Sequence, residues 1–272
     1  MATNQGISFL YSFDLGNRLV DNFGSNVIRV SSTKTGDFDK GNVTSESVRE
    51  VWRSDNVLTL QEIVIKADIK SEIDTFAILG HNFSIGAVVK VEANIDDVWI
   101  APPFSQQVVV DEEVNNIILA NGGFGGEYEY YRVTVLDPSN ACGYIEIGRI
   151  VGGQAFTFEN NEDITDTYKI ANVDQSEKMK TQGYFRASNE NIIVRSFSAN
   201  FSKLFSVTGQ DDNFRGFRRL WKTVKTTRPF LTVLDRDNTQ IFNVWGQFKS
   251  LPDESFGINQ FVNTPVSIEE VF

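Results

Sequence analysis

Histidine and cysteine are almost absent from this chain of 272 residues, which has one of each, His81 and Cys142. A single cysteine excludes an intrachain disulfide and any zinc site with several cysteine ligands. A single histidine excludes a metal site with several histidine ligands, and a serine-histidine-aspartate triad would have to use His81. We therefore predict no enzymatic activity, no metal and no cofactor, and we interpret Cys142 as a small buried side chain.

Positive charge is also scarce, because 25 Lys and Arg stand against 36 Asp and Glu, for a net charge of -11. Such a chain repels phosphate backbones, so we predict no binding to nucleic acid. No apolar run approaches the roughly 20 residues that span a bilayer, and the N-terminus has no basic segment followed by a continuous apolar one. We therefore expect no membrane insertion and synthesis in the cytoplasm.

Aromatic residues are plentiful by contrast, with 22 Phe among them, and they favour the half-buried faces of β-sheets. Residues 63–69 alternate between apolar and mostly polar side chains, as in a strand with one buried face. Residues 76–79 and 89–93 give two further strands, joined through His81 to Gly86. The length suggests two domains, and the pattern predicts a mainly β fold.

Two loops interrupt these strands. Trp99 to Ala101 runs into Pro102 and Pro103, which places this segment in a loop or at a sheet edge. Asn121 to Gly126 is rich in glycine, but a phosphate-binding loop leads into a helix, whereas here the strand Tyr128 to Leu136 follows. We therefore interpret residues 121–126 as a surface loop.

Turn residues Asp137 to Asn140 predict that the next strand, Gly143 to Val151, returns as the second strand of a hairpin. We place the domain boundary after Gly152, giving domains 1–152 and 153–272. The acidic stretch from Glu159 to Thr181 fits either a linker or a strand-and-loop excursion.

The second domain is predicted to be β-rich with one helix. A strand at residues 193–201 precedes a helix near 211–225, where apolar residues recur at helical spacing behind the capping candidates Asp211 to Asn213. Residues 229–234 and 240–248 form a second hairpin, and residues 265–272 a last strand.

Candidate contact residues come from two groups. Aromatic side chains in the first domain fit a sugar-stacking platform, although core packing or a subunit contact explains them equally well. A basic helix face fits an anionic partner or an ordinary solvated surface. The candidates are Trp52, Trp99, Phe124, Tyr128, Tyr130, Arg215, Arg218, Arg219 and Lys222.

Three segments carry a resemblance to a known family. They are Val51 to Ser54, Ile78 to Phe83, and above all Tyr131 to Ile150, which contains Asp-x-x-Asn followed by Gly-Tyr-Ile-Glu-Ile-Gly. This part of the chain resembles the galactose-binding-like, discoidin-type jelly roll found in structural proteins of tailed bacteriophages. The resemblance implies an N-terminal β-sandwich and covers the segment up to Ile150.

The resemblance implies a structural component of the virion, at the tail tip or baseplate, such as a distal tail or adaptor protein. Its partners would be copies of itself and other tail proteins, and it would be made in the bacterial host cytoplasm. The alternative is a carbohydrate-binding module for host-surface glycans, since a fold does not fix a function. A glycan depolymerase that uses carboxylates is the third hypothesis.

Overall fold

A computed structural model of the chain describes residues 8–10, 27–45, 47–111, 115–120, 124–157, 169–174, 178–181, 184–187, 193–205, 212–233, 243–252, 255–256 and 261–271. The chain divides into two compact units. The N-terminal unit is chiefly Ser8–Ala155, and the C-terminal unit is chiefly Phe156–Thr232 and Val244–Val271. Two short strands, β1 (Ser8–Leu10) and β12 (Ala155–Thr157), lie where the chain passes between units.

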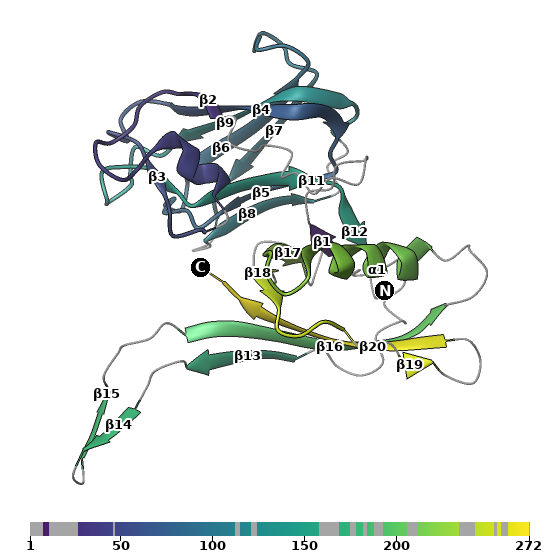
Figure 1. Cartoon of the computed structure of the whole chain (residues 1–272). Helices are drawn as coiled ribbons and strands as arrows, with labels where there is room; N and C mark the ends of the chain where they lie inside the picture. Colours follow the sequence, from purple (N-terminus) through teal and green to yellow (C-terminus); the bar gives the residue numbers. More distant parts are fainter. Residues whose placement is uncertain are drawn as a thin grey trace. The chain divides into compact units, whose positions relative to one another are not determined.

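The N-terminal unit contains two main antiparallel sheets (Figure 1). The five-stranded sheet has the order β2 (Val27–Val30), β4 (Gln61–Glu72), β9 (Glu127–Leu136), β6 (Val88–Asn94) and β7 (Phe104–Val109). The three-stranded sheet has the order β11 (Arg149–Gly153), β5 (Thr75–Leu79) and β8 (Asn116–Ala120). A short pair, β3 (Trp52–Arg53) with β10 (Glu146–Ile147), and a 3-10 helix, η1 (Lys40–Thr44), complete this unit.

One hydrophobic core joins the two sheets. Ile63 and Val133 point into it from the five-stranded sheet, and Phe76 and Ile117 from the three-stranded sheet. Alternate residues of β4, β6 and β9 face this core, and charged residues such as Glu62, Glu92 and Arg132 lie on the opposite face of the five-stranded sheet. The unit is therefore a β-sandwich, and the prediction of a mainly β fold is confirmed.

The predicted hairpin after β9 is wrong. Residues 146–147 pair with β3, and β11 pairs with β5 in the other sheet. The physical reason lies in β11, where the consecutive residues Ile150 and Val151 are both buried. A hairpin strand beside β9 would expose one of them, whereas a strand covered on both faces buries both. The segment His81 to Gly86 also crosses between the sheets, from β5 to β6.

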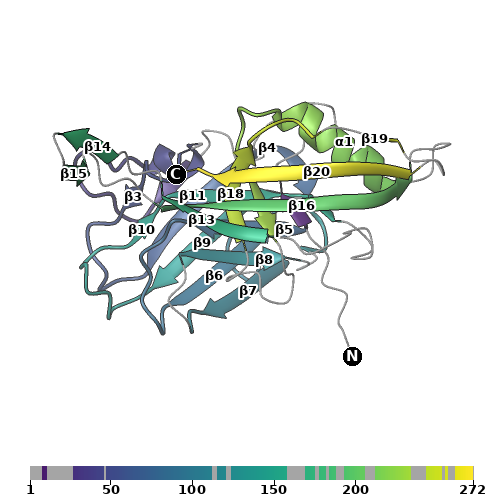
Figure 2. The ribbon, with the colours of Figure 1, turned by 90° about the horizontal axis from the view of Figure 1, so that it is seen from below.

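The C-terminal unit contains a sheet in which β17 (Phe230–Val233), β18 (Asn243–Phe248), β20 (Phe261–Glu270), β16 (Ile193–Phe205) and β13 (Lys169–Asp174) are successive neighbours. Strand β19 (Ser255–Phe256) pairs with β20, and β14 (Lys178–Thr181) pairs with β15 (Tyr184–Ala187). Figure 2 shows β16 and β20 side by side along most of their length.

Helix α1 (Asp212–Val224) confirms the helix predicted near residues 211–225. Phe217 and Val224, two of the apolar residues at helical spacing, are fully buried, whereas Trp221 is half-buried and the neighbouring Leu220 is buried instead. The ring of Phe217 meets that of Phe248 on β18 edge-on, with 6.4 Å between centroids. The apolar face of α1 therefore packs on its own sheet. The turn expected at residues 235–238, between the two strands of the second predicted hairpin, lies outside the described residues.

Candidate functional site

A cleft of about 220 Å³ opens on the outer face of the five-stranded sheet, the face turned away from the core. Side chains from three adjacent strands, β9, β6 and β7, form most of it. The lining residues are Leu60, Val88, Lys90, Glu92, Gln107, Arg132, Thr134 and Leu136.

The register of β6 and β9 places these side chains opposite one another. Lys90 pairs with Thr134, Glu92 with Arg132, and Val88 with Leu136. Residues that face each other directly across an antiparallel pair share one face and lie within contact distance. Two polar or charged pairs and one apolar pair therefore form a row across the middle of the sheet.

The Glu92 carboxylate is the centre of this row, and only 1% of its side chain is exposed. Arg132 Nε donates to its Oε2 at 2.7 Å, and Arg132 Nη2 forms an ion pair with the same oxygen at 2.5 Å. The Lys90 ammonium lies 2.5 Å from Oε1. A carboxylate so well removed from water needs opposite charges beside it. The cleft thus has a fixed, paired ionic floor.

The ion pairs continue along the sheet toward β2. Arg132 Nη1 lies 3.3 Å from Glu62, which also accepts a hydrogen bond from Arg29 Nε at 2.9 Å. Arg29 Nη1 reaches Asp97 at 2.8 Å. This network, which we call the outer-face ion network, consists of the cations Arg29, Lys90 and Arg132 and the anions Glu62, Glu92 and Asp97.

Two predicted contact residues lie on this face, Trp99 and Tyr130, both half-buried. The Arg132 guanidinium lies over the Trp99 ring, 4.7 Å from its centroid, and Trp99 Nε1 donates to Asp97 at 2.7 Å. Tyr130 precedes Arg132 on the same face of β9, and the Lys66 ammonium is 5.5 Å from its ring centroid. Both aromatics therefore flank the cleft without lining it.

Three other predicted residues belong to the core instead. Trp52 is fully buried, and its indole nitrogen donates to the Ser32 carbonyl at 3.2 Å. Phe124 is buried and stacks on Phe104 with 4.0 Å between ring centroids, and Tyr128 is buried as well. A ligand at the surface does not reach these rings, so their prediction as contact residues is corrected to core packing.

The predicted basic residues of α1 lie in the other unit. Arg218, Arg219 and Lys222 are exposed, and the side chain of Arg215 lies outside the described part of the chain. The Lys222 ammonium lies 5.8 Å from the ring centroid of Trp221.

The only histidine, His81, holds a loop in place. Its Nδ1 accepts a hydrogen bond from the Phe83 backbone N–H at 3.3 Å, and the two rings stack at 4.1 Å. Burial lowers the pKa of His81 to about 4, against a smaller opposing effect of the Asp137 charge. The ring is therefore neutral at physiological pH. Cys142, by contrast with its prediction, is exposed.

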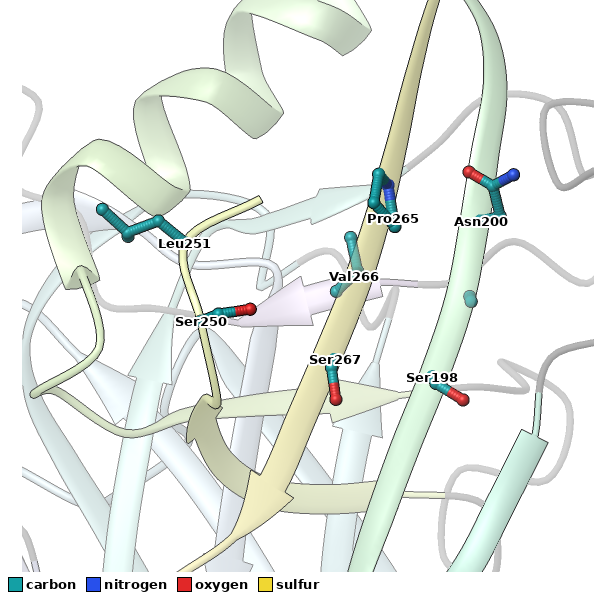
Figure 3. A pocket seen from close by; sticks show the side chains of 8 residues that line it. Ser198, Asn200, Ser250, Leu251, Pro265, Val266 and Ser267 are labelled. Carbon is teal, nitrogen blue, oxygen red and sulfur yellow. The ribbon is translucent and has the colours of Figure 1, made fainter. Parts of the chain in front are cut away.

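A second hollow, of about 370 Å³, lies in the C-terminal unit (Figure 3). Strands β16 and β20 form its floor, and the segment after β18 forms one side. Its lining contains small or uncharged residues and no aromatic ring, namely Ser198, Ala199, Asn200, Ser250, Leu251, Pro265, Val266 and Ser267. No charged side chain lines it, whereas Lys90, Glu92 and Arg132 line the cleft in the N-terminal unit.

The described residues contain no cluster of three or more His, Cys, Asp or Glu side chains placed to hold a metal ion. Within the same residues, no helix has the length and hydropathy that crossing a membrane requires.

No protein-family model and no curated protein matches the chain. Solved structures similar to it include chitosan-binding module 1 of a Paenibacillus chitosanase/glucanase, with 11% sequence identity and a TM-score of 0.40. The match covers 49% of this chain and 98% of that module. The module CBM32-3 from a family 31 glycoside hydrolase of Clostridium perfringens has 18% identity, TM-score 0.39 and coverage of 49% of this chain and 93% of the module.

Reduced XRCC1, in complex with the catalytic domain of DNA polymerase beta, is also similar, with 10% identity, TM-score 0.38 and coverages of 47% and 95%. Structural neighbours of the chain thus include carbohydrate-binding modules and a protein of another kind. At these identities and TM-scores, the similarities carry no conclusion about function.

Proposed function

We propose that the N-terminal unit binds neutral glycans at the cleft on the outer face of its five-stranded sheet. The observation that carries this proposal is the combination of a paired ionic floor, apolar walls and two flanking aromatic rings on one face. Binding pockets generally join apolar walls to a few fixed polar groups that orient the ligand. Sugars present both kinds of surface, hydroxyl groups at the ring edge and C–H groups on the ring faces.

Charge balance favours a neutral ligand. The outer-face ion network has three cations and three anions, so it carries no net charge. The Lys90 ammonium still has hydrogen-bonding capacity, because it has three donors and its ion pair with Glu92 involves a single carboxylate oxygen. The amide of Gln107 adds a donor and an acceptor. Hydroxyl groups match such donors and acceptors without adding a charge.

The size of the cleft favours a small unit of the ligand. Its volume of about 220 Å³ is below the range of about 300–1,000 Å³ for drug-sized ligands. Leu60 and Leu136, which line it, are 53% and 40% exposed and give a sugar ring an apolar contact. We infer that one sugar residue enters the cleft and that its neighbours extend toward Trp99.

A glycan array, followed by calorimetric titration of the best neutral oligosaccharide, tests this proposal. We expect Arg132→Met and Gln107→Ala to weaken binding strongly, and Trp99→Ala to weaken it by about tenfold, the loss of roughly 1.4 kcal/mol of stacking. Tyr144→Ala is the matched control, since Tyr144 is a half-buried aromatic away from this cleft.

Equal binding by wild type and the cleft variants, or no neutral glycan bound at millimolar concentration, refutes the proposal. Circular dichroism confirms that each variant is folded before it is scored.

The more specific prediction of a tail-tip or baseplate component in a virion stays a prediction, and so does the absence of enzymatic activity. Detection of the protein in purified virions by mass spectrometry would support the first. None of the three solved structures named above is a phage protein.

A further inference from the structure

The two edges of the five-stranded sheet differ in how they are protected against pairing. Strand β2 has four residues, and its register with β4 shifts between Val27 and Arg29. Arg29 on this strand forms ion pairs with Glu62 and Asp97. Short length, irregular register and charge are the usual means by which proteins prevent strand addition at an edge.

Strand β7 at the opposite edge has none of these protections. Its six residues, Phe-Ser-Gln-Gln-Val-Val, include no charge and no proline, and they pair with β6 in unbroken register from Phe104 to Val109. Among the residues that the structure describes, no strand pairs with its outer side, and Figure 2 shows it as the last strand of the sheet. Such an edge is a ready site for another strand.

The backbone groups available at this edge follow from the ladder with β6. Val110 donates its N–H to Ala87 at 2.9 Å and accepts from Gly86 at 2.7 Å, so its polar groups face β6. Backbone groups alternate in direction along a strand. The N–H and C=O groups of Ser105, Gln107 and Val109 therefore point to the open edge.

Side-chain burial also indicates that the edge is incompletely covered. Phe104 and Val108 pack against the core, yet both stay partly exposed. Val109 is 51% exposed. Apolar surface at an unpaired strand is stabilised when a further strand covers it.

We propose that β7 pairs antiparallel with β7 of a second copy of this chain, about a twofold axis at Gln107. In this arrangement Gln107 faces the partner's Gln107, and Ser105 faces the partner's Val109. All three outward-pointing residues then form backbone hydrogen bonds, about six in total across the pair. No like charges meet, and the outer faces of both sheets remain on the same side.

The partner is a second copy because the open edge is complementary to itself. Its three outward residues are evenly spaced about Gln107, and all are uncharged. A twofold axis makes the same patch serve both subunits, which is the commonest form of dimer.

The dimer has a consequence that rests on the proposed function. Gln107 lines the cleft, so the clefts of the two copies lie near the axis. A glycan with repeated units would contact both, and the second contact would benefit from a high effective concentration.

Sedimentation velocity of the full chain tests the proposal. We expect wild type to sediment at twice the chain mass of 30.6 kDa. Gln107→Lys and Gln107→Glu each place like charges opposite one another, so each variant alone should sediment as a monomer. An equimolar mixture of the two variants should regain the dimer, because opposite charges then face each other.

Ile100→Lys is the control for added charge, since Ile100 lies in a loop and is 89% exposed; it should leave the dimer intact. Monomeric wild type at its highest soluble concentration, or a mass unchanged by both Gln107 variants, overturns the proposal. Glycan binding by wild type is measured separately, so an intact dimer that binds no glycan refutes only the proposed function.

Discussion

Arg132 and Glu92 stand directly opposite each other on β9 and β6, and two guanidinium nitrogens of Arg132 reach the same carboxylate oxygen. Glu92 is almost inaccessible to water, whereas Arg132 is 18% exposed. The pair therefore links two central strands of the sheet and also forms the floor of the proposed glycan site.

Loss of Arg132 should destabilise the N-terminal unit. In Arg132→Leu, Glu92 keeps only Lys90 as a partner, and an undercompensated buried charge should cost about 3 kcal/mol of unfolding free energy. The double variant Arg132→Leu with Glu92→Leu should recover part of this loss, because no charge is then left buried. Urea denaturation of both single variants and the double variant measures the coupling. Additive single-variant effects would contradict a direct interaction.

Gly148 lies too close to neighbouring backbone for any side chain. Its N–H donates to the carbonyls of Leu79 and Gly80, both at 3.1 Å. A Cβ at this position would clash with the Val48 carbonyl oxygen and lie 3.2 Å from that of Leu79. Backbone atoms do not move aside as a side chain does, so Gly148→Ala should lower the unfolding free energy by about 3 kcal/mol.

Gly143→Ala provides a comparison for that prediction. Gly143 has a φ of +74°, but nothing lies within 4 Å of an added Cβ. Only conformational strain acts there, so the cost should be about 1 kcal/mol. Thermal or urea unfolding of both variants separates the two effects. An equal cost at the two positions would show that the close approach at Gly148 is unimportant.

The strands and the helix could be predicted from the sequence because local periodicity determines which faces are apolar. The alternation at residues 63–69 and 89–93 matches β4 and β6, and the spacing of Phe217 and Val224 matches α1. The pairing of residues 146–153 was missed because the turn at Asp137 is compatible with a hairpin. The signal in the sequence was the adjacent apolar pair Ile150 and Val151, which is typical of a strand covered on both faces, and both residues are buried in the structure.

The candidate site was predicted only in part. Alternation along β9 does place Tyr130, Arg132 and Thr134 on one polar face, but it does not reveal that β6 is the neighbour that supplies Glu92 and Lys90. Trp52 and Trp99 are both tryptophans, but Trp52 lies in the core, enclosed where β3 pairs with β10, whereas Trp99 is half-buried on the outer face. Aromatic character alone does not distinguish a core ring from a surface ring.

Stability of the N-terminal unit should fall as the pH falls below 6.5, because His81 is buried in the neutral form. Its pKa is about 4 in the folded protein and near 6.5 when unfolded. Above pH 6.5 the ring is neutral in both states and the full stability is present. Between pH 6.5 and 4 only the unfolded state takes up the proton, so acidification favours unfolding.

The expected loss from this one group is about 2 kcal/mol between pH 7.5 and pH 5, and it approaches about 3 kcal/mol below pH 4. Urea denaturation at both pH values measures it in wild type and in His81→Gln, which keeps an acceptor but does not titrate. Carboxylates contribute similarly to both proteins, so the difference between their pH dependences isolates His81. Parallel pH dependences in the two proteins would mean that His81 is accessible to protons in the folded state.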